Sequence, residues 1–274
     1  MSTVALESAD VALKQLTVAY REHTAVQALT GEFITGSLTA VVGPNGAGKS
    51  SLLTAIMGHL KPVEGEVSFS ACAYGRIAWL PQQSAIDRSF PIKTFELVAM
   101  GHWAKTGSFR PLDAVHRAEV QQALDAVGMG NCAQRSIGEL SAGQFQRALF
   151  ARVMLQDAQV ILLDEPFSAV DARTTADLLG VVARWQREAR TVIAVLHDLE
   201  QARLHFERSL LLARRCVAWG PSAEVLTAAN LLRAQQMSEA WDADDRSDES
   251  ADESTHQSTS SVITNAGLIW KQAA

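Results

Sequence analysis

The segment VILLDEPFSAVD, at residues 160–171, contains two adjacent carboxylates. Four apolar residues lead directly into Asp164 and Glu165, which is the pattern of a buried strand that ends on charge. Burying carboxylates is costly unless a cation or a reacting water uses them. The stretch therefore predicts a site in which Asp164 and Glu165 act on a bound cation and on water.

A phosphate-binding loop is predicted at residues 43–50, GPNGAGKS. The pattern G-x-x-x-x-G-K-[ST] lies between a predicted buried strand ending at Val42 and the apolar run SLLTAIMG, which is the context that the motif requires. Its glycines let backbone N–H groups close on phosphate oxygens, and the helix N-terminus adds a favourable dipole. In this motif Lys49 reaches the β- and γ-phosphates and the Ser50 hydroxyl coordinates Mg²⁺. A glycine-rich turn without a ligand is the alternative, and the later carboxylates argue against it.

Three further segments carry polar side chains where a ligand can bind. Gln82 and His197 each follow a predicted strand, and the carboxyl ends of parallel strands are where ligands bind. Leu140–Gln144 precedes a helix with one apolar face, one helix length before VILLDEP. Each has an ordinary reading as well: surface polarity for Gln82, a structural His–Asp pair for His197, and an N-cap for Ser141.

The elements that position these residues alternate between strands and helices. Residues 11–42 predict short strands, and 63–82 predict a hairpin and a further strand. Helices are predicted at 112–127 and 174–189, a strand pair at 209–219 and a final helix at 222–237. The segment between Gln82 and Leu140 reads as a helical insert.

Charge and composition exclude several classes of protein. No apolar run approaches the roughly 18 residues that span a bilayer, and the N-terminus lacks the basic and apolar segments of a secretory signal. The three cysteines are isolated, which is typical of reduced thiols in a cytosolic protein. The net charge of −6 equals the charge of residues 242–256 alone, so the remaining body is neutral and we expect no nucleic-acid partner. The acidic tail is expected to be disordered.

The motifs GPNGAGKS, PQ, LSAGQ, ILLDEP, SAVD and LHD, in this order, resemble those of the ATP-binding subunit of ABC transporters. The resemblance covers about residues 10–235. It implies an α/β fold, a P-loop NTPase (RecA-like) core with an antiparallel β subdomain and an α-helical subdomain at about 84–150. It places the ATPase domain at 1–240 and leaves 241–274 as the acidic, Ser-rich tail.

The resemblance also implies a role for each motif residue. Glu165 matches the general base, His197 the switch histidine and Gln82 the glutamine that senses Mg²⁺ and the attacking water. Ser50, Gln82 and Asp164 match the Mg²⁺ ligands. The nucleotide-binding positions are Tyr20, which stacks on adenine, then Gly43, Pro44, Asn45, Gly46, Ala47, Gly48, Lys49, Ser50 and Ser51, the signature Leu140, Ser141, Ala142, Gly143 and Gln144, and Asp171. The signature commonly reads LSGGQ, so Ala142 is a mild departure.

The implied activity is ATP hydrolysis, with ATP and Mg²⁺ bound, coupled to transport. In the family the signature lies far from its own phosphate loop, so the active form is a head-to-tail dimer with two ATP sites. The implied partners are membrane permease subunits and, indirectly, a periplasmic or extracellular solute-binding protein. The implied location is the cytoplasmic face of the membrane, as a peripheral protein.

The segment at 84–103 looks like that of ATPases from zinc, manganese and iron uptake systems, and in the family it faces the permease. A divalent metal, zinc or manganese, is therefore the expected cargo. Siderophore, haem and cobalamin importers have related subunits and remain an alternative. A soluble ABC ATPase acting on DNA or ribosomes is another, although such proteins typically carry two cassettes or a coiled-coil insertion. A small-molecule kinase would leave LSAGQ unexplained.

Overall fold

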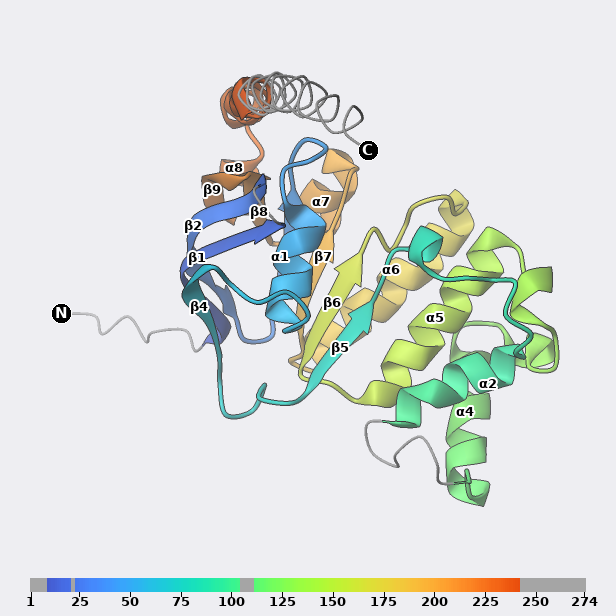
Figure 1. Ribbon diagram of the computed structural model, residues 1–274. Coiled ribbons are helices and arrows are strands. Elements are labelled where there is room, and N and C mark those ends of the chain that lie inside the picture. Colours follow the sequence, from blue (N-terminus) through green and yellow to red (C-terminus); the bar gives the residue numbers. More distant parts are fainter. Residues whose placement is uncertain (1–8, 21–22, 104–110, 242–274) are drawn as a thin grey trace, which may run out of the picture.

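The computed structural model describes residues 9–20, 23–103 and 111–241. Within this part of the chain a large central sheet lies between a smaller sheet and a group of helices (Figure 1). The predicted tail at 241–274 lies outside the described residues except for Trp241.

The large sheet has the strand order β5-β6-β7-β3-β8-β9. Neighbours from β5 to β8 are parallel, and β9 runs antiparallel to β8. The bounds are β3 (Leu38–Val42), β5 (Ile77–Leu80), β6 (Val160–Asp164), β7 (Thr191–Val195), β8 (Arg208–Ala213) and β9 (Arg215–Pro221). The parallel register brings the carboxyl ends of β3, β5, β6 and β7 to one edge of the sheet. The predicted buried strand ending at Val42 and the predicted closing strand pair are confirmed.

The small sheet is antiparallel, in the order β2-β1-β4. Its strands are β1 (Ala9–Tyr20), β2 (His23–Ile34) and β4 (Glu64–Phe69). The hairpin predicted within 63–82 is wrong, because β4 pairs with β1 whereas β5 pairs with β6 of the other sheet. Both stretches form strands as expected, but the turns at 71–75 carry the chain from one sheet to the other.

Alternation along β6 divides the core into two clusters. Val160 and Leu162 belong to a cluster with α1 (Lys49–Ile56) and the small sheet, whereas Ile161 and Leu163 belong to the cluster shared with α5 and α6. Successive side chains of a strand point to opposite faces, so a fully apolar strand serves both clusters. Packing on both faces holds β6 in place and so fixes the position of Asp164 at its carboxyl end.

Helices α6 (Ala172–Arg187), α7 (Leu199–His205) and α8 (Ser222–Val225) follow the strands of the large sheet. α6 begins two residues before the predicted start because the Asp171 side chain caps it at Ala172. The single helix predicted at 222–237 is wrong, because the chain leaves helical conformation at Leu226 and Thr227 before residues 228–241 become helical.

The remaining helices form a separate lobe around α5 (Ala142–Gln156), on the right of Figure 1. Its other elements are η1 (Gln83–Ala85), α2 (Thr94–Ala99), η2 (Met100–His102), α4 (Ala114–Ala126), η3 (Gly130–Cys132) and η4 (Ile137–Glu139). Helix α5 contacts α2, α4 and η2 of this lobe and also β5 and α6 of the core. The helix predicted at 112–127 is confirmed.

No helix among the described residues is long and apolar enough to cross a membrane. All three cysteines lie in the described part and none forms a disulfide.

Candidate nucleotide site

The loop between β3 and α1 has the backbone conformation of a phosphate cradle. Gly43 and Gly48 have φ values of 153° and 88°, and a Cβ at Gly48 would collide with the carbonyl oxygen of Ala25. Only glycine fits a positive φ with a neighbouring backbone so close. The loop N–H groups and the N-terminus of α1 therefore face one small pocket of about 240 Å³.

Lys49 lies folded against this loop. Its side chain is almost buried, and Nζ donates hydrogen bonds to the carbonyl oxygens of Gly43 at 2.9 Å and Pro44 at 2.8 Å. Burial lowers the pKa of the ammonium, and the negative charges of Glu165 and Asp164 oppose that shift. Phosphate oxygens would replace these carbonyl acceptors and add negative charge next to the ammonium.

Asp164 ends β6 directly opposite the start of α1. The Ser50 hydroxyl donates to Asp164 Oδ1 at 3.0 Å, so two oxygen ligands of the kind that Mg²⁺ prefers lie side by side. Burial raises the pKa of the Asp164 carboxyl, and the hydrogen bond from Ser50 only partly offsets this. A cation bound between these oxygens would favour the ionised form.

Three side chains from three different elements hold the Glu165 carboxylate. Gln82 donates from Nε2 to Oε2 at 2.9 Å, the Ser168 hydroxyl donates to Oε2 at 3.1 Å, and His197 Nε2 lies 2.7 Å from Oε1. Burial alone would raise the pKa of Glu165, but the hydrogen bonds of His197, Ser168 and Gln82 and the charge of His197 together lower it. The carboxylate is thus fixed in orientation and kept ionised.

The contribution of Ser168 was not expected from the sequence. Glu165 has a φ of 49°, a left-handed conformation that turns the chain after β6, and Ser168 N then donates to the Glu165 carbonyl at 3.2 Å. This turn brings the Ser168 side chain back onto the carboxylate three residues earlier. A non-glycine residue with positive φ beside a charged cluster is a feature typical of functional sites.

The predicted signature residues begin helix α5. The Ser141 hydroxyl accepts from Gln144 N and the Gln144 side chain accepts from Ser141 N, both at 3.1 Å, which forms a capping box. A Cβ at Gly143 would lie 3.2 Å from Thr174 Oγ1, at the first turn of α6. Asp171 caps that helix and accepts from Thr174 N at 2.9 Å. The starts of α5 and α6 therefore lie together.

A buried glutamine connects the signature helix to the carboxylate strand. Gln146 is fully buried on α5; its Nε2 donates to the Pro166 carbonyl at 2.7 Å, and its Oε1 accepts from Gln83 Nε2 at 2.6 Å. Pro166 follows Glu165, and Gln83 follows Gln82. Sequence reasoning missed this link, although a glutamine on the buried face of α5 was a visible signal.

The structure brings together most of the predicted site. The residues that line the pocket are Ala25, Asn45, Gly46, Ala47, Gly48, Lys49, Ser50, Ser51, Glu165 and His197. Tyr20, half exposed at the end of β1, does not line it, nor do Leu140–Gln144 or Asp171. The role of Tyr20 in stacking on adenine stays a prediction. Among the described residues, the signature does not line the phosphate pocket of its own chain.

The family model described as ABC transporter matches residues 26–168. The manganese transport system ATP-binding protein MntB of Bacillus subtilis is 36% identical over 225 residues, which is 81% of this chain and 90% of the relative. The zinc transport system ATP-binding protein TroB of Treponema pallidum is 36% identical over 238 residues, 85% of this chain and 90% of the relative.

Solved structures share the fold. A protein described as a metal-chelate type ABC transporter, in an inward-facing conformation, has a TM-score of 0.73 at 26% identity, covering 82% of this chain and 88% of the other. A nucleotide-free ATP-binding cassette from an ABC transporter has a TM-score of 0.74 at 19% identity, covering 83% and 99%.

Proposed function

The chain belongs to the ABC transporter family, as an ATP-binding subunit, and from this premise we propose that it hydrolyses ATP to power uptake of a divalent transition metal, manganese or zinc. The observation that carries the ATPase assignment is the Glu165 carboxylate, held by Gln82, Ser168 and His197 beside the phosphate loop. The names of the manganese and zinc relatives support the cargo.

The chain's own residues suit a nucleoside triphosphate with Mg²⁺. Loop N–H groups and Lys49 bind the phosphates, and Lys49 already rests on carbonyl oxygens that phosphates would replace. Ser50, Asp164 and Gln82 would hold Mg²⁺, which neutralises phosphate charge when bound. The 3.0 Å approach of the Ser50 and Asp164 oxygens fits that role.

Glu165 is placed to act on water. Phosphoryl transfer to water needs a nucleophile in line with the leaving group, and most of the catalysis is positioning. The ionised Glu165 accepts a proton from the attacking water, while Gln82 and His197 fix the carboxylate's orientation. The His197 ring is close to half exposed and lines the pocket, so it lies where the pocket opens to solvent.

A second copy of the chain completes the site. At the start of α5, Ser141 is exposed and Ala142 and Gly143 are partly exposed, and none of the three lines the phosphate pocket of its own chain. In a head-to-tail dimer, the N-terminus of one α5 would face the γ-phosphate held by the other copy. Closure would also exclude bulk water from Glu165.

The membrane partner is proposed to bind the helical lobe. The segment 84–103 lies in this lobe, and Arg88 donates hydrogen bonds to the carbonyl oxygens of Leu140 and Ile137 and stacks 4.9 Å from the Phe145 ring centre. A permease that moves this segment would therefore move the signature. The chain would act peripherally at the cytoplasmic face, with a solute-binding protein delivering cargo to the permease.

Substituting Glu165 by Gln tests the ATPase mechanism. The amide cannot accept the water proton, so kcat should fall about 10²- to 10⁴-fold while ATP binding persists. Phosphate release and nucleotide binding by the purified chain measure the two effects, and Glu66→Gln, an exposed change on β4, is the control. Near-normal hydrolysis by Glu165→Gln would show that Glu165 is not the base.

A further inference from the structure

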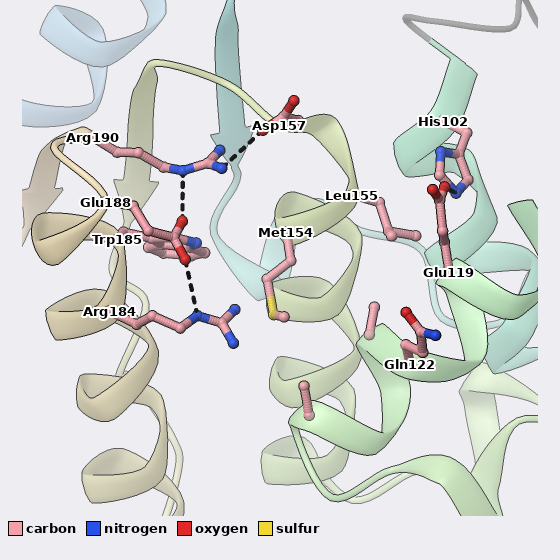
Figure 2. A pocket seen from close by; sticks show the side chains of 12 residues that line it. His102, Glu119, Gln122, Met154, Leu155, Asp157, Arg184, Trp185, Glu188 and Arg190 are labelled. Carbon is pink, nitrogen blue, oxygen red and sulfur yellow. Dashed lines mark hydrogen bonds and ion pairs between the residues drawn. The ribbon is translucent and has the colours of Figure 1, made fainter.

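A second cluster of polar side chains lies in the helical lobe, away from the nucleotide pocket. His102 ends η2, and His116 and Glu119 lie in the first turns of α4. One ligand atom from each of the three lies within 4.8 Å of the other two. Figure 2 shows His102 and Glu119 side by side at one wall of a pocket of about 480 Å³.

The secondary structure produces this cluster. Residues three apart on a helix share a face, so His116 and Glu119 project together from α4. The His102 and His116 rings meet edge to face with centres 4.9 Å apart, and His102 Nε2 lies 3.4 Å from Glu119 Oε2. The cluster thus joins two elements that are separated in sequence by residues 103–113.

The side chains of the cluster differ in burial, and this difference suits a metal site. The His102 side chain is 2% exposed, whereas that of Glu119 is 48% exposed. A buried imidazole supplies a fixed ligand, and an exposed carboxylate can rotate to meet an incoming cation. Three ligands of one tetrahedral zinc, each about 2.0–2.2 Å from the metal, lie roughly 3.3–3.6 Å apart. Rotation of the Glu119 side chain can therefore complete the geometry.

A fourth side chain orients one of the histidines. Asp113 Oδ1 lies 2.8 Å from His116 Nδ1 and also accepts from His116 N at 2.9 Å. A carboxylate on one ring nitrogen selects the tautomer and leaves Nε2 as the metal ligand, which is the usual arrangement around bound zinc. Asp113 is also the N-cap of α4, so one carboxylate fixes both the start of the helix and the His116 ring.

We propose that His102, His116 and Glu119 bind one divalent transition-metal cation, with Asp113 positioning His116. Two imidazoles and one carboxylate suit Zn²⁺ and leave its fourth position open to water from the pocket. The pocket shares no lining residue with the nucleotide pocket. The bound cation would tie η2 to α4 and so stabilise the helical lobe that carries α5, independently of ATP binding.

Zinc titration of the purified, metal-stripped full chain tests this site. Competition with a chromophoric chelator should show one Zn²⁺ per chain, and His116→Ala and Glu119→Gln should each weaken binding at least about tenfold. Asp113→Asn should weaken it about 10- to 100-fold; because Asn is also a good N-cap, α4 itself should persist. His205→Ala and Glu66→Gln are exposed changes outside the cluster and should leave zinc affinity unchanged.

Two further readouts locate the metal. Co²⁺ should give the visible bands of a tetrahedral site without thiolate charge transfer, and Zn²⁺ should raise the melting temperature of the wild type but not of His116→Ala. Circular dichroism verifies that each variant is folded. The proposal is overturned if the wild type binds no Zn²⁺. It is equally overturned if folded His116→Ala and Glu119→Gln retain wild-type affinity, since the metal would then be bound elsewhere, at His256 or a cysteine.

Discussion

Asp164 and Glu165 are neighbours in sequence, yet the pKa values of their carboxyl groups shift in opposite directions. Burial dominates at Asp164 and raises its pKa, whereas hydrogen bonds from three side chains outweigh burial at Glu165 and lower its pKa. A bound cation would stabilise the ionised form of the desolvated Asp164, and a carboxyl kept ionised, like that of Glu165, is in the protonation state that a general base needs. These opposite shifts support the metal role proposed for Asp164 and the base role proposed for Glu165.

Replacing His197 by Ala should move the acid limb of the pH–kcat profile to higher pH. Glu165 must be ionised to act as base, and its activity is lost as pH falls through its pKa. Without the hydrogen bond and charge of His197, burial is less opposed and the pKa of Glu165 rises. The remaining charged neighbours, Asp164 and Lys49, are unchanged. Steady-state rates over a pH series measure the limb, and a limb that stays in place or moves to lower pH would refute the role given to His197.

Sequence motifs were enough to select residues that the structure places next to one another. Asp164 ends β6, Gln82 and His197 follow β5 and β7, and Ser50 lies in the first turn of the helix after β3; parallel pairing brings these strand ends together. The motifs could not predict the hydrogen bond from Ser168 to Glu165, because that contact depends on the left-handed backbone of a glutamate. Positive φ at a non-glycine residue has no clear sequence signal.

At the scale of elements, Gln146 links three segments that belong to different parts of the fold. It joins α5 to the turn after β6 and to Gln83 after β5, without solvent contact. Buried polar networks hold one arrangement of their elements because each group needs its partner. A displacement of α5 should therefore shift Pro166 and Gln83, and with them their sequence neighbours Glu165 and Gln82.

Gln146→Leu should lower the free energy of unfolding by about 1–3 kcal/mol, since the Pro166 carbonyl and the Gln83 amide lose their buried partner. Urea denaturation measures the change as a lower midpoint with an unchanged slope. Gln235→Leu, at an exposed helical position, is the matched control. A midpoint for Gln146→Leu equal to that of the control would show that the link carries no stability.

The elements show where local patterns suffice and where they fail. The apolar strands and the amphipathic α4 follow from periodicity. The hairpin predicted within 63–82 fails because the partner of β4 is β1, more than forty residues earlier, and alternation does not specify a partner. The break at Leu226 and Thr227 separates two stretches that each have good helix formers.

At the scale of the whole molecule, the phosphate pocket and the signature residues lie apart on one chain. The phosphate pocket contains Lys49, Ser50 and Glu165 but no signature residue, and the start of α5 is accessible. Two copies arranged head to tail would join the phosphate pocket of each to the signature of the other. Hydrolysis would then require ATP-dependent association.

Ser141→Asp should prevent that association without unfolding α5. Asp is as good an N-cap as Ser, but its charge would repel the γ-phosphate bound by the partner. In a Glu165→Gln background, sedimentation should show an ATP-dependent dimer that Ser141→Asp abolishes. Ser141→Asn caps the helix without charge and should retain the dimer. Dimerisation that is unaffected by Ser141→Asp would place the signature away from the interface.

Metal uptake by cells tests the central claim most directly. In metal-limited medium, cells whose only copy of this chain carries Glu165→Gln should take up manganese or zinc more slowly than cells with the unmodified chain. Cells with Glu66→Gln should behave like the unmodified strain. Immunoblots establish that the chains are equally abundant. The account predicts a selective loss of one of these two metals, and unchanged uptake of both would contradict it.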